Sequence, residues 1–219
     1  MVKIGINGFG RIGRLILRAI LENYKNKIQV VAINDLGPIE TNAHLIKYDS
    51  THGIINEEIQ TSKNGFKVGN HDIKVFSERD PANISWGKVS ADIVLECTGI
   101  FLDKQSAEKH IKGGAKKVII SAPGKEVDFT VVQGVNSKEL KKEHNIISNG
   151  SCTTNCLAPV AMVLEKTFGI NYGYMTTIHS YTGDQKLLDT LHKDLRRARS
   201  TEGSMIPTST GAAKAMSLV

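Results

Sequence analysis

A glycine-rich turn near the start of the chain constrains the fold more than any other feature. Residues 2–6 are an apolar run typical of a buried strand, and residues 14–23 carry apolar side chains at helical spacing. Between them, Gly8, Gly10 and Gly13 have the spacing G-x-G-x-x-G. In such a turn the glycines permit a tight bend, an approach of the backbone to a pyrophosphate, and close packing of helix on strand. Because the turn joins a strand to a helix, the pattern favours a dinucleotide site over a purely structural bend.

An acidic residue follows at the distance that such a site requires. Residues 28–34 form a second apolar strand, and Asp35 comes directly after it. A carboxylate about 20 residues past the glycines hydrogen-bonds the ribose hydroxyls of the adenosine. It would also repel a 2′-phosphate, and Leu36 and Gly37 carry no positive charge that offsets this repulsion. We therefore expect NAD to be preferred over NADP.

The middle of the chain continues to alternate strands with helices. One helix is expected to begin at Asp103, a good N-cap, and to end at Gly113 and Gly114. The other expected elements are a helix at 41–47, a hairpin of strands at 66–68 and 73–76, and apolar strands at 92–99 and 117–121. This alternation predicts an α/β fold with a Rossmann-type doubly wound parallel sheet.

Three residues at strand ends are candidates for the ligand site of that sheet. In doubly wound sheets, ligands bind in the crevice outside the carboxyl ends of the strands. Thr98, Gly99 and Ser121 would lie there. Each of them taken alone is about equally well explained as an ordinary turn residue.

The segment 148–156 places a thiol at the start of another helix. Ser151 is a good N-cap, and the residues after Cys152 have helix composition, so a helix is expected at 152–166. Backbone N–H groups and the positive end of the helix dipole favour thiolate, the nucleophilic form, at such a position. A small buried cysteine that opens a core helix explains these residues equally well.

A histidine further along the chain changes that balance. Residues 171–181 are rich in Tyr, Thr and Ile and are expected to form a strand. The helix would advance roughly 22 Å at about 1.5 Å per residue, and a strand of about eight residues would return roughly 26 Å. His179 would then lie near Cys152, the arrangement of an activated thiol. The alternative is a histidine in the core with satisfied hydrogen bonds.

The last part of the chain is polar and irregular. Residues 182–203 are expected to form a long loop, with a short helix near His192, and loops of this length are usually functional. Its arginines could pair with phosphate, or they could form a solvated basic face. Residues 208–211 lead into a helix expected at 212–216, whose first N–H groups would suit an anion.

Composition excludes several classes of protein. The net charge is +6, but the lysines are dispersed and aromatic residues make up only 5% of the chain, which argues against a nucleic-acid-binding stripe. Cys97, Cys152 and Cys156 are an odd number without metal-ligand spacing, so we expect no metal and a reduced, cytoplasmic setting. No apolar run is long enough to span a bilayer, and no signal peptide is expected.

Several motifs together point to one family. They are the glycine turn at 8–13, Asn34-Asp35, the run at 47–53, Cys97-Thr98-Gly99, Ser151-Cys152-Thr153-Thr154-Asn155-Cys156, His179 and the run at 210–214. Over its whole length the chain resembles phosphorylating glyceraldehyde-3-phosphate dehydrogenase, and the Ser-Cys-Thr-Thr-Asn-Cys segment is highly specific for that family. The resemblance implies an NAD-binding Rossmann domain at 1–151 and the first part of an α+β catalytic domain at 152–219.

The resemblance also implies roles for single residues. Cys152 would be the nucleophile and His179 its base. The residues expected at NAD are Gly8, Gly10, Gly13, Thr98 and Gly99, from the pattern, Asp35 and Ser121, from both the pattern and the resemblance, and Arg11, Ile12 and Arg79, from the resemblance. Those expected to bind the two phosphate groups are Ser151, Thr153, Thr182, Arg197, Thr210 and Gly211.

The implied reaction is the glycolytic oxidation and phosphorylation of glyceraldehyde 3-phosphate to 1,3-bisphosphoglycerate. Cys152 would form a thiohemiacetal and then a thioester, with His179 taking the proton, and inorganic phosphate would release the product. A homotetramer is implied as well. Two alternatives remain open, namely erythrose-4-phosphate dehydrogenase and a nucleotide- or nucleic-acid-binding module without catalysis.

The chain ends earlier than members of that family do. The part beyond Val219 would hold a phosphate-binding arginine, an asparagine at the nicotinamide and the rest of the catalytic sheet. We therefore expect the 219-residue chain to be inactive by itself. A sheet without its remaining strands would leave an apolar face and an open edge.

Overall fold

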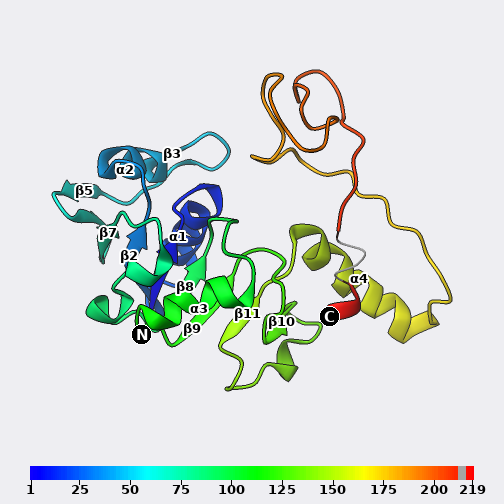
Figure 1. The fold of residues 1–219 in the computed structure, drawn as a ribbon, viewed down its shortest axis with the longest axis horizontal. Coiled ribbons are helices and arrows are strands. Elements are labelled where there is room, and N and C mark those ends of the chain that lie inside the picture. Colours follow the sequence, from blue (N-terminus) through cyan, green and yellow to red (C-terminus); the bar gives the residue numbers. More distant parts are fainter. Residues whose placement is uncertain (212–215) are drawn as a thin grey trace. The chain divides into compact units, whose positions relative to one another are not determined.

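The computed structural model describes residues 1–211 and 216–219, which form two compact units (Figure 1). The first unit comprises residues 1–152 with Val219, and the second comprises residues 153–218. The helix expected at 212–216 lies outside the described residues except for its last position. A short 3₁₀ helix, η4, follows at Met216–Leu218.

Within the described residues, the first unit is built on a nine-stranded sheet in the order β10-β11-β9-β8-β1-β2-β7-β6-β5. Seven of its strands run parallel, and β6 and β5 add an antiparallel edge. The strands are β1 (Val2–Asn7), β2 (Ile28–Asn34), β5 (Ile59–Ser62), β6 (Gly65–Val68), β7 (His71–Phe76), β8 (Ile93–Glu96), β9 (Lys117–Ile120), β10 (Phe129–Thr130) and β11 (Ile146–Ser148). The predicted Rossmann-type doubly wound sheet is confirmed.

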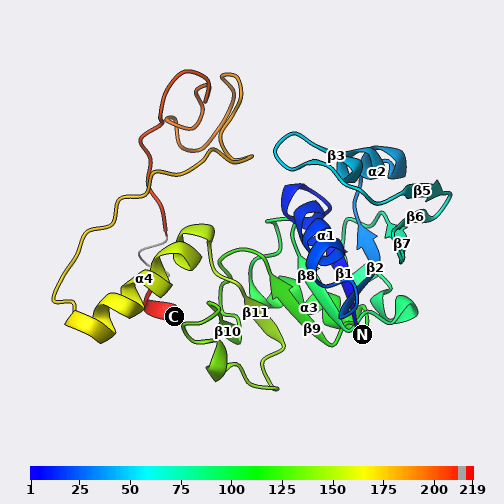
Figure 2. The same ribbon diagram turned by 180° about the vertical axis from the view of Figure 1, so that it is seen from behind.

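Helices cover both faces of the sheet. The α-helices of this unit are α1 (Arg11–Asn23), α2 (Ile39–Lys47) and α3 (Lys104–Lys112), and the short elements are β3 (Tyr48–Asp49), β4 (Gly53–Ile54), η1 (Pro81–Asn83), η2 (Trp86–Val89) and η3 (Ser137–Glu139). The side chains of β1 alternate, so that Ile4 and Ile6 pack with α1, whereas Gly5 faces Trp86. Figures 1 and 2, seen from opposite sides, show α1 and α3 on different faces of the sheet.

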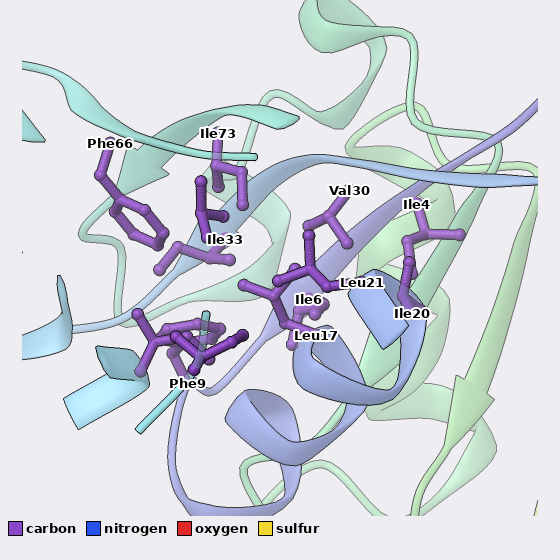
Figure 3. Close-up of a cluster of buried hydrophobic side chains, with 13 residues drawn as sticks. Ile4, Ile6, Phe9, Leu17, Ile20, Leu21, Val30, Ile33, Phe66 and Ile73 are labelled. Carbon is purple, nitrogen blue, oxygen red and sulfur yellow. The ribbon is translucent and has the colours of Figure 1, made fainter. Parts of the chain in front are cut away.

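The largest apolar cluster lies between α1 and the sheet (Figure 3). Leu17, Ile20 and Leu21 project from α1 onto the side chains of β1 and β2, and Phe66 and the other members extend the cluster toward the antiparallel edge. Spacing of three and four residues places these α1 side chains on one stripe of the helix. The helix was predicted from the spacing of Leu15, Ile16, Ala19 and Ile20, but of these only Ile20 is buried, while Leu15 and Ile16 are half-buried and Ala19 is exposed.

Local signals predicted most of the remaining elements of this unit. The hairpin is formed by β6 and β7, with Val68 opposite His71. Helix α3 has Asp103 as its N-cap, whose carboxylate accepts the N–H of Ser106 at 2.8 Å, and Gly113 as its C-cap. The helix after the glycine turn begins at Arg11, three residues earlier than predicted, because Gly10 is already its N-cap.

The strand predicted at 92–99 is shorter than expected and ends at Glu96. The carboxylate of Glu96 accepts the backbone N–H of Thr98 at 2.7 Å, and Gly99 has a φ of +72°. These two features turn the chain away from the sheet. The Thr98 N–H binds a side chain instead of a neighbouring strand, and Gly99 has a left-handed backbone conformation that a strand does not contain.

Helix α4 (Cys152–Phe168) is the helix predicted after the thiol motif, two residues longer than expected. The strand predicted at 171–181 was wrong, because this segment is irregular and Tyr174 is fully exposed. Strand propensity becomes a strand only when a neighbour takes the backbone hydrogen bonds, and no strand of the described residues pairs with it.

The short helix expected near His192 was also wrong. The segment consists of turns in which Asp194 N–H donates to Nδ1 of His192 at 2.9 Å. The Asp194 carboxylate in turn accepts the N–H of Arg196 at 3.0 Å. Side chains that accept nearby backbone N–H groups compete with helical bonds, which explains the turns.

The packing at Gly5 gives a stability prediction. A Cβ there would lie 2.4 Å from an atom of the fully buried Trp86 ring, so Gly5→Ala should lower the free energy of unfolding by about 1–3 kcal/mol. Gly87→Ala is the matched control, because the nearest atom to its added Cβ lies 3.6 Å away. Urea unfolding measures both, and equal stability of the two variants would contradict the packing argument.

The burial of His71 predicts a pH dependence. Burial lowers the pKa of its imidazole from 6.5, and Nδ1 accepts the N–H of Val30 at 3.1 Å, which requires an unprotonated nitrogen. Below pH 6.5 the unfolded chain therefore binds a proton that the folded chain refuses, so stability is complete above 6.5 and falls as the pH drops. Urea unfolding at about pH 7.5 and about pH 5.5 should show a smaller difference for His71→Asn than for the unsubstituted chain.

Candidate functional site

A pocket of about 380 Å³ opens at the carboxyl ends of β1, β2 and β8. This is the edge at which doubly wound sheets bind ligands. Its lining residues are Asn7, Gly8, Gly10, Asn34, Asp35, Leu36, Glu78, Arg79, Cys97, Thr98, Ile100 and Phe101. Five of the ten predicted cofactor residues are among them, and Arg11, Ile12, Gly13, Gly99 and Ser121 are not.

The three glycines of the turn have different surroundings. Gly8 has a φ of +86°, and a Cβ there would lie 2.8 Å from the backbone nitrogen of Thr98. A Cβ on Gly13 would lie 2.3 Å from the carbonyl oxygen of Gly8, whereas nothing lies within 4 Å of the Cβ position of Gly10. The first and third glycines thus permit close backbone packing, and the second leaves open space at the start of α1.

The carboxylate of Asp35 is held by the backbone on both oxygens. Oδ2 accepts the N–H of Phe9 at 2.9 Å, and Oδ1 accepts the N–H of Gly37 at 2.8 Å. Oδ1 also accepts Nδ2–H of Asn42 at 3.4 Å. A carboxylate has about four acceptor positions, two on each oxygen, so Oδ2 can still accept a further hydrogen bond from a ligand hydroxyl. The contact with Phe9 also ties the end of β2 to the glycine turn.

Arg11 is engaged outside the lining of the pocket. Its guanidinium pairs with Asp49, whose carboxylate also accepts the N–H groups of His52 and Thr51. These backbone bonds, led by that from His52 and joined by Arg11, lower the pKa of Asp49 to about 2. A role of Arg11 at the cofactor would therefore use its backbone N–H, or would require its side chain to leave Asp49.

Cys97 lies in the pocket wall but is not poised as a nucleophile. Burial raises the pKa of its thiol to about 11, and a hydrogen bond from the Ser121 side chain offsets this only in part. The thiol is therefore protonated at neutral pH. Ser121 does not line the pocket, but its side chain contacts Cys97 in the pocket wall.

Cys152 and His179 belong to different units. Cys152 is the exposed first residue of α4, in the first unit, and Cys156 is exposed one turn later. His179 lies in the second unit, where its Nδ1 contacts the carbonyl oxygen of Ser180 at 2.6 Å. The pairing of the two side chains stays a prediction.

In the second unit, Arg197 links two stretches that contain predicted phosphate-binding residues. Its guanidinium donates to the hydroxyl of Thr208 and to the carbonyl of Ser209, both at 3.0 Å, directly before Thr210 and Gly211. It also pairs with Asp184, whose N–H donates to the hydroxyl of Thr182 at 3.4 Å. Ser151 precedes α4, and Thr153 is the second residue of that helix.

Comparison with known proteins decides the family. Residues 2–104 match the family "Glyceraldehyde 3-phosphate dehydrogenase, NAD binding domain", and residues 151–219 match "Glyceraldehyde 3-phosphate dehydrogenase, C-terminal domain". The chain belongs to the glyceraldehyde-3-phosphate dehydrogenase family.

Curated relatives of this family match the chain over its whole length. Proteins named glyceraldehyde-3-phosphate dehydrogenase from Xanthobacter flavus and Geobacillus stearothermophilus are both 57% identical to it, and glyceraldehyde-3-phosphate dehydrogenase 1 of Bacillus cereus is 56% identical. The matches include 100% of this chain but 65% of each relative. Among residues 1–211 and 216–219, no helix is long and apolar enough to cross a membrane.

Several residues that line the pocket of this dehydrogenase-family chain were not predicted from the sequence. Asn7 and Asn34 are the last residues of β1 and β2, and a polar residue at the end of an apolar strand was a usable signal. Glu78, Ile100 and Phe101 follow strands at distances that no local pattern marks. Their positions depend on strand register.

Proposed function

We propose that the protein to which this chain belongs oxidises and phosphorylates glyceraldehyde 3-phosphate with NAD, a reaction of glycolysis. The single observation that carries the proposal is the pocket at the carboxyl edge of the sheet. There the glycine turn and the Asp35 carboxylate lie together in a chain of this family. The cytoplasm and a homotetramer are part of the same proposal.

The residues of the pocket fit a dinucleotide. The open space at Gly10 and the first N–H groups of α1 suit a pyrophosphate, because a helix N-terminus binds anions. Asp35 has acceptor capacity left for ribose hydroxyls. Arg79 and Thr98, on the walls, complete the proposed contacts, with Gly8, Gly13, Arg11, Ile12, Gly99 and Ser121 as the remaining proposed residues. When bound, NAD accepts the hydride of the substrate aldehyde.

Cys152 is the proposed nucleophile. Its exposed thiol lies at the first residue of a 17-residue helix, where the helix dipole favours thiolate. The sulfur adds to the aldehyde carbon and forms a thiohemiacetal. His179, the proposed base, takes the hydroxyl proton as the hydride leaves, and a thioester remains on the sulfur. Inorganic phosphate then attacks the thioester carbonyl and releases the thiolate.

The proposed phosphate sites are built largely from the second unit. The Arg197 guanidinium can bind a phosphate in its planar fork, and its contacts with Thr208 and Ser209 place it beside Thr210 and Gly211. Ser151, Thr153 and Thr182 complete the proposed set. Asp184 competes with phosphate for Arg197, so phosphate binding would exchange one anion for another.

An assay of nicotinamide reduction tests the reaction. We would compare this chain with a chimera in which the C-terminal part of the Geobacillus stearothermophilus relative follows Val219, since the match includes 65% of that protein. Phosphate-dependent reduction with glyceraldehyde 3-phosphate by the chimera supports the proposal. Faster reduction with erythrose 4-phosphate would move the substrate to the alternative enzyme, and no reduction with either would refute the activity.

Cysteine labelling tests the nucleophile. Iodoacetamide should modify Cys152 several times faster than Cys156, although both are exposed on α4, because only Cys152 lies at the helix start. Cys97, whose pKa is about 11, should react most slowly. In the chimera, His179→Asn should slow the labelling of Cys152. Peptide mass spectrometry measures the labelling rate of each cysteine. Equal rates at the three thiols would contradict this assignment.

The cofactor preference is tested at Asp35. Calorimetry should show tighter binding of NAD than of NADP, and Asp35→Gly should bring the two dissociation constants to within about tenfold of each other. The ratio is the readout, because partial unfolding of a variant lowers both affinities alike. Asp72→Asn, which removes an exposed carboxylate of β7, should leave the ratio unchanged. If Asp35→Gly keeps the ratio of NADP to NAD dissociation constants of the unsubstituted chain, Asp35 does not contact the cofactor.

A further inference from the structure

A buried carboxylate lies beneath the pocket. The side chain of Glu96, the last residue of β8, is 0% exposed. Its Oε2 accepts Nδ2–H of Asn7 at 2.6 Å and Nε2–H of His110 at 3.0 Å. Its Oε1 accepts the backbone N–H of Thr98 at 2.7 Å and also the Thr98 hydroxyl. Glu96 itself does not line the pocket, but Asn7 and Thr98 do.

One branch of this network runs from Trp86 through His110 to Glu96, and the donor and acceptor of each of its hydrogen bonds are fixed. The indole Nε1 of Trp86 can only donate, and it donates to Nδ1 of His110 at 3.0 Å. Nδ1 must then be unprotonated, so the ring proton is on Nε2 and points at Glu96. All three side chains of this branch are buried.

The second branch runs from Asn34 through Asn7 to Glu96. Asn7 donates with its amide nitrogen, so its oxygen faces Asn34, whose Nδ2 donates to it at 2.8 Å. Asn34 also binds the backbone of Glu78 twice, through its oxygen at 2.8 Å and its nitrogen at 2.9 Å. Donors from both branches converge on Glu96, which can accept them all only as a carboxylate.

Strand register places this network directly under the pocket walls. Asn7 pairs with Asn34 across β1 and β2, and with Glu96 across β1 and β8, so the three side chains lie in one row on the same face of the sheet. The row ends at Glu78 on one side and at Thr98 on the other. The hydroxyl of Thr98 in turn accepts the N–H of Ile100 at 3.1 Å.

We propose that Glu96 is the positioning residue of the cofactor pocket. Its carboxylate orients Asn7, Asn34 and Thr98, and through them it fixes the loop at Glu78 and the loop at Thr98. Trp86 and His110, which do not line the pocket, contribute to its shape because they fix one of the donors on Glu96. The link to NAD rests on the proposed function, whereas the positioning of the two loops does not.

No local change can compensate for the loss of the carboxylate. In Glu96→Gln, the new amide must direct its NH₂ group at Thr98 N–H or at the donors of Asn7 and His110. His110 cannot change its tautomer without turning an N–H against the indole N–H of Trp86. Asn7 cannot reverse without facing the amide nitrogen of Asn34. The conflict therefore passes along both branches.

Hydrogen exchange of the whole 219-residue chain tests the positioning without a cofactor. In Glu96→Gln, the amides of Thr98 and Glu78 should exchange faster, and the indole N–H signal should shift, which is readable because the chain has a single tryptophan. Calorimetry with NAD should show affinity about tenfold lower. Glu22→Gln, which changes an exposed carboxyl group of α1, is the matched control and should alter none of these.

A pair of variants at His110 keeps the test decisive if Glu96→Gln does not fold. His110→Gln preserves the direction of the branch, because its oxygen can accept from Trp86 while its nitrogen donates to Glu96. His110→Phe removes both contacts. The Phe variant should show faster exchange at Thr98 and weaker NAD binding than the Gln variant, although residue 110 is outside the pocket lining.

Two results would overturn the proposal. One is unchanged exchange at Thr98 and Glu78 in a folded Glu96→Gln protein, whatever its NAD affinity. The other is identical behaviour of His110→Phe and His110→Gln. If the unsubstituted chain does not bind NAD, the proposed cofactor fails, but the exchange measurements still decide whether Glu96 positions the loops.

Discussion

The structure of the first unit depends on a close approach of backbones at Gly8. A Cβ there would lie 2.8 Å from the Thr98 nitrogen, and one on Gly13 would lie 2.3 Å from the Gly8 oxygen. Because neither side chain exists, the end of β1, the start of α1 and the loop after β8 meet at one point. The central strand β1 pairs with β2 and β8, so their carboxyl ends gather around this point. The pocket is the space that remains between these strand ends, the start of α1 and the loop after β8.

The two faces of the sheet are stabilised in different ways at this edge. Toward α1, apolar side chains such as Ile6 and Leu17 fill the space. On the other face, the last residues of β1, β2 and β8 are Asn7, Asn34 and Glu96, and all three are buried. Burial of a carboxylate costs free energy unless its acceptor positions are filled. Four hydrogen-bond donors fill the acceptor positions of Glu96. Hydrogen bonds are directional, so this polar row fixes the orientation of its side chains more strictly than an apolar layer would.

The parts of the fold that could be predicted from the sequence are those with a local physical cause. The glycine turn, the Asp103 cap and the apolar stripe of α1 each specify their own geometry. Strands of two to four residues, such as β10 and β11, have too few residues to show a period. The same division applies to the site. Asp35 could be predicted from its distance to the glycines, whereas Glu96 required knowledge of which strand lies beside β1.

The second unit shows what strand propensity means without a partner. Residues 171–181 have the composition of a strand, yet Ile178 is 87% exposed and the segment has no regular structure. The contacts that organise residues 182–209 are polar instead, centred on Arg197 and Asp194. Exposed ion pairs contribute little free energy each, so they select a local path for the chain without forming a core. A segment rich in Tyr, Thr and Ile therefore has side chains that pack well in a sheet, but it forms a strand only when a neighbouring strand pairs with its backbone.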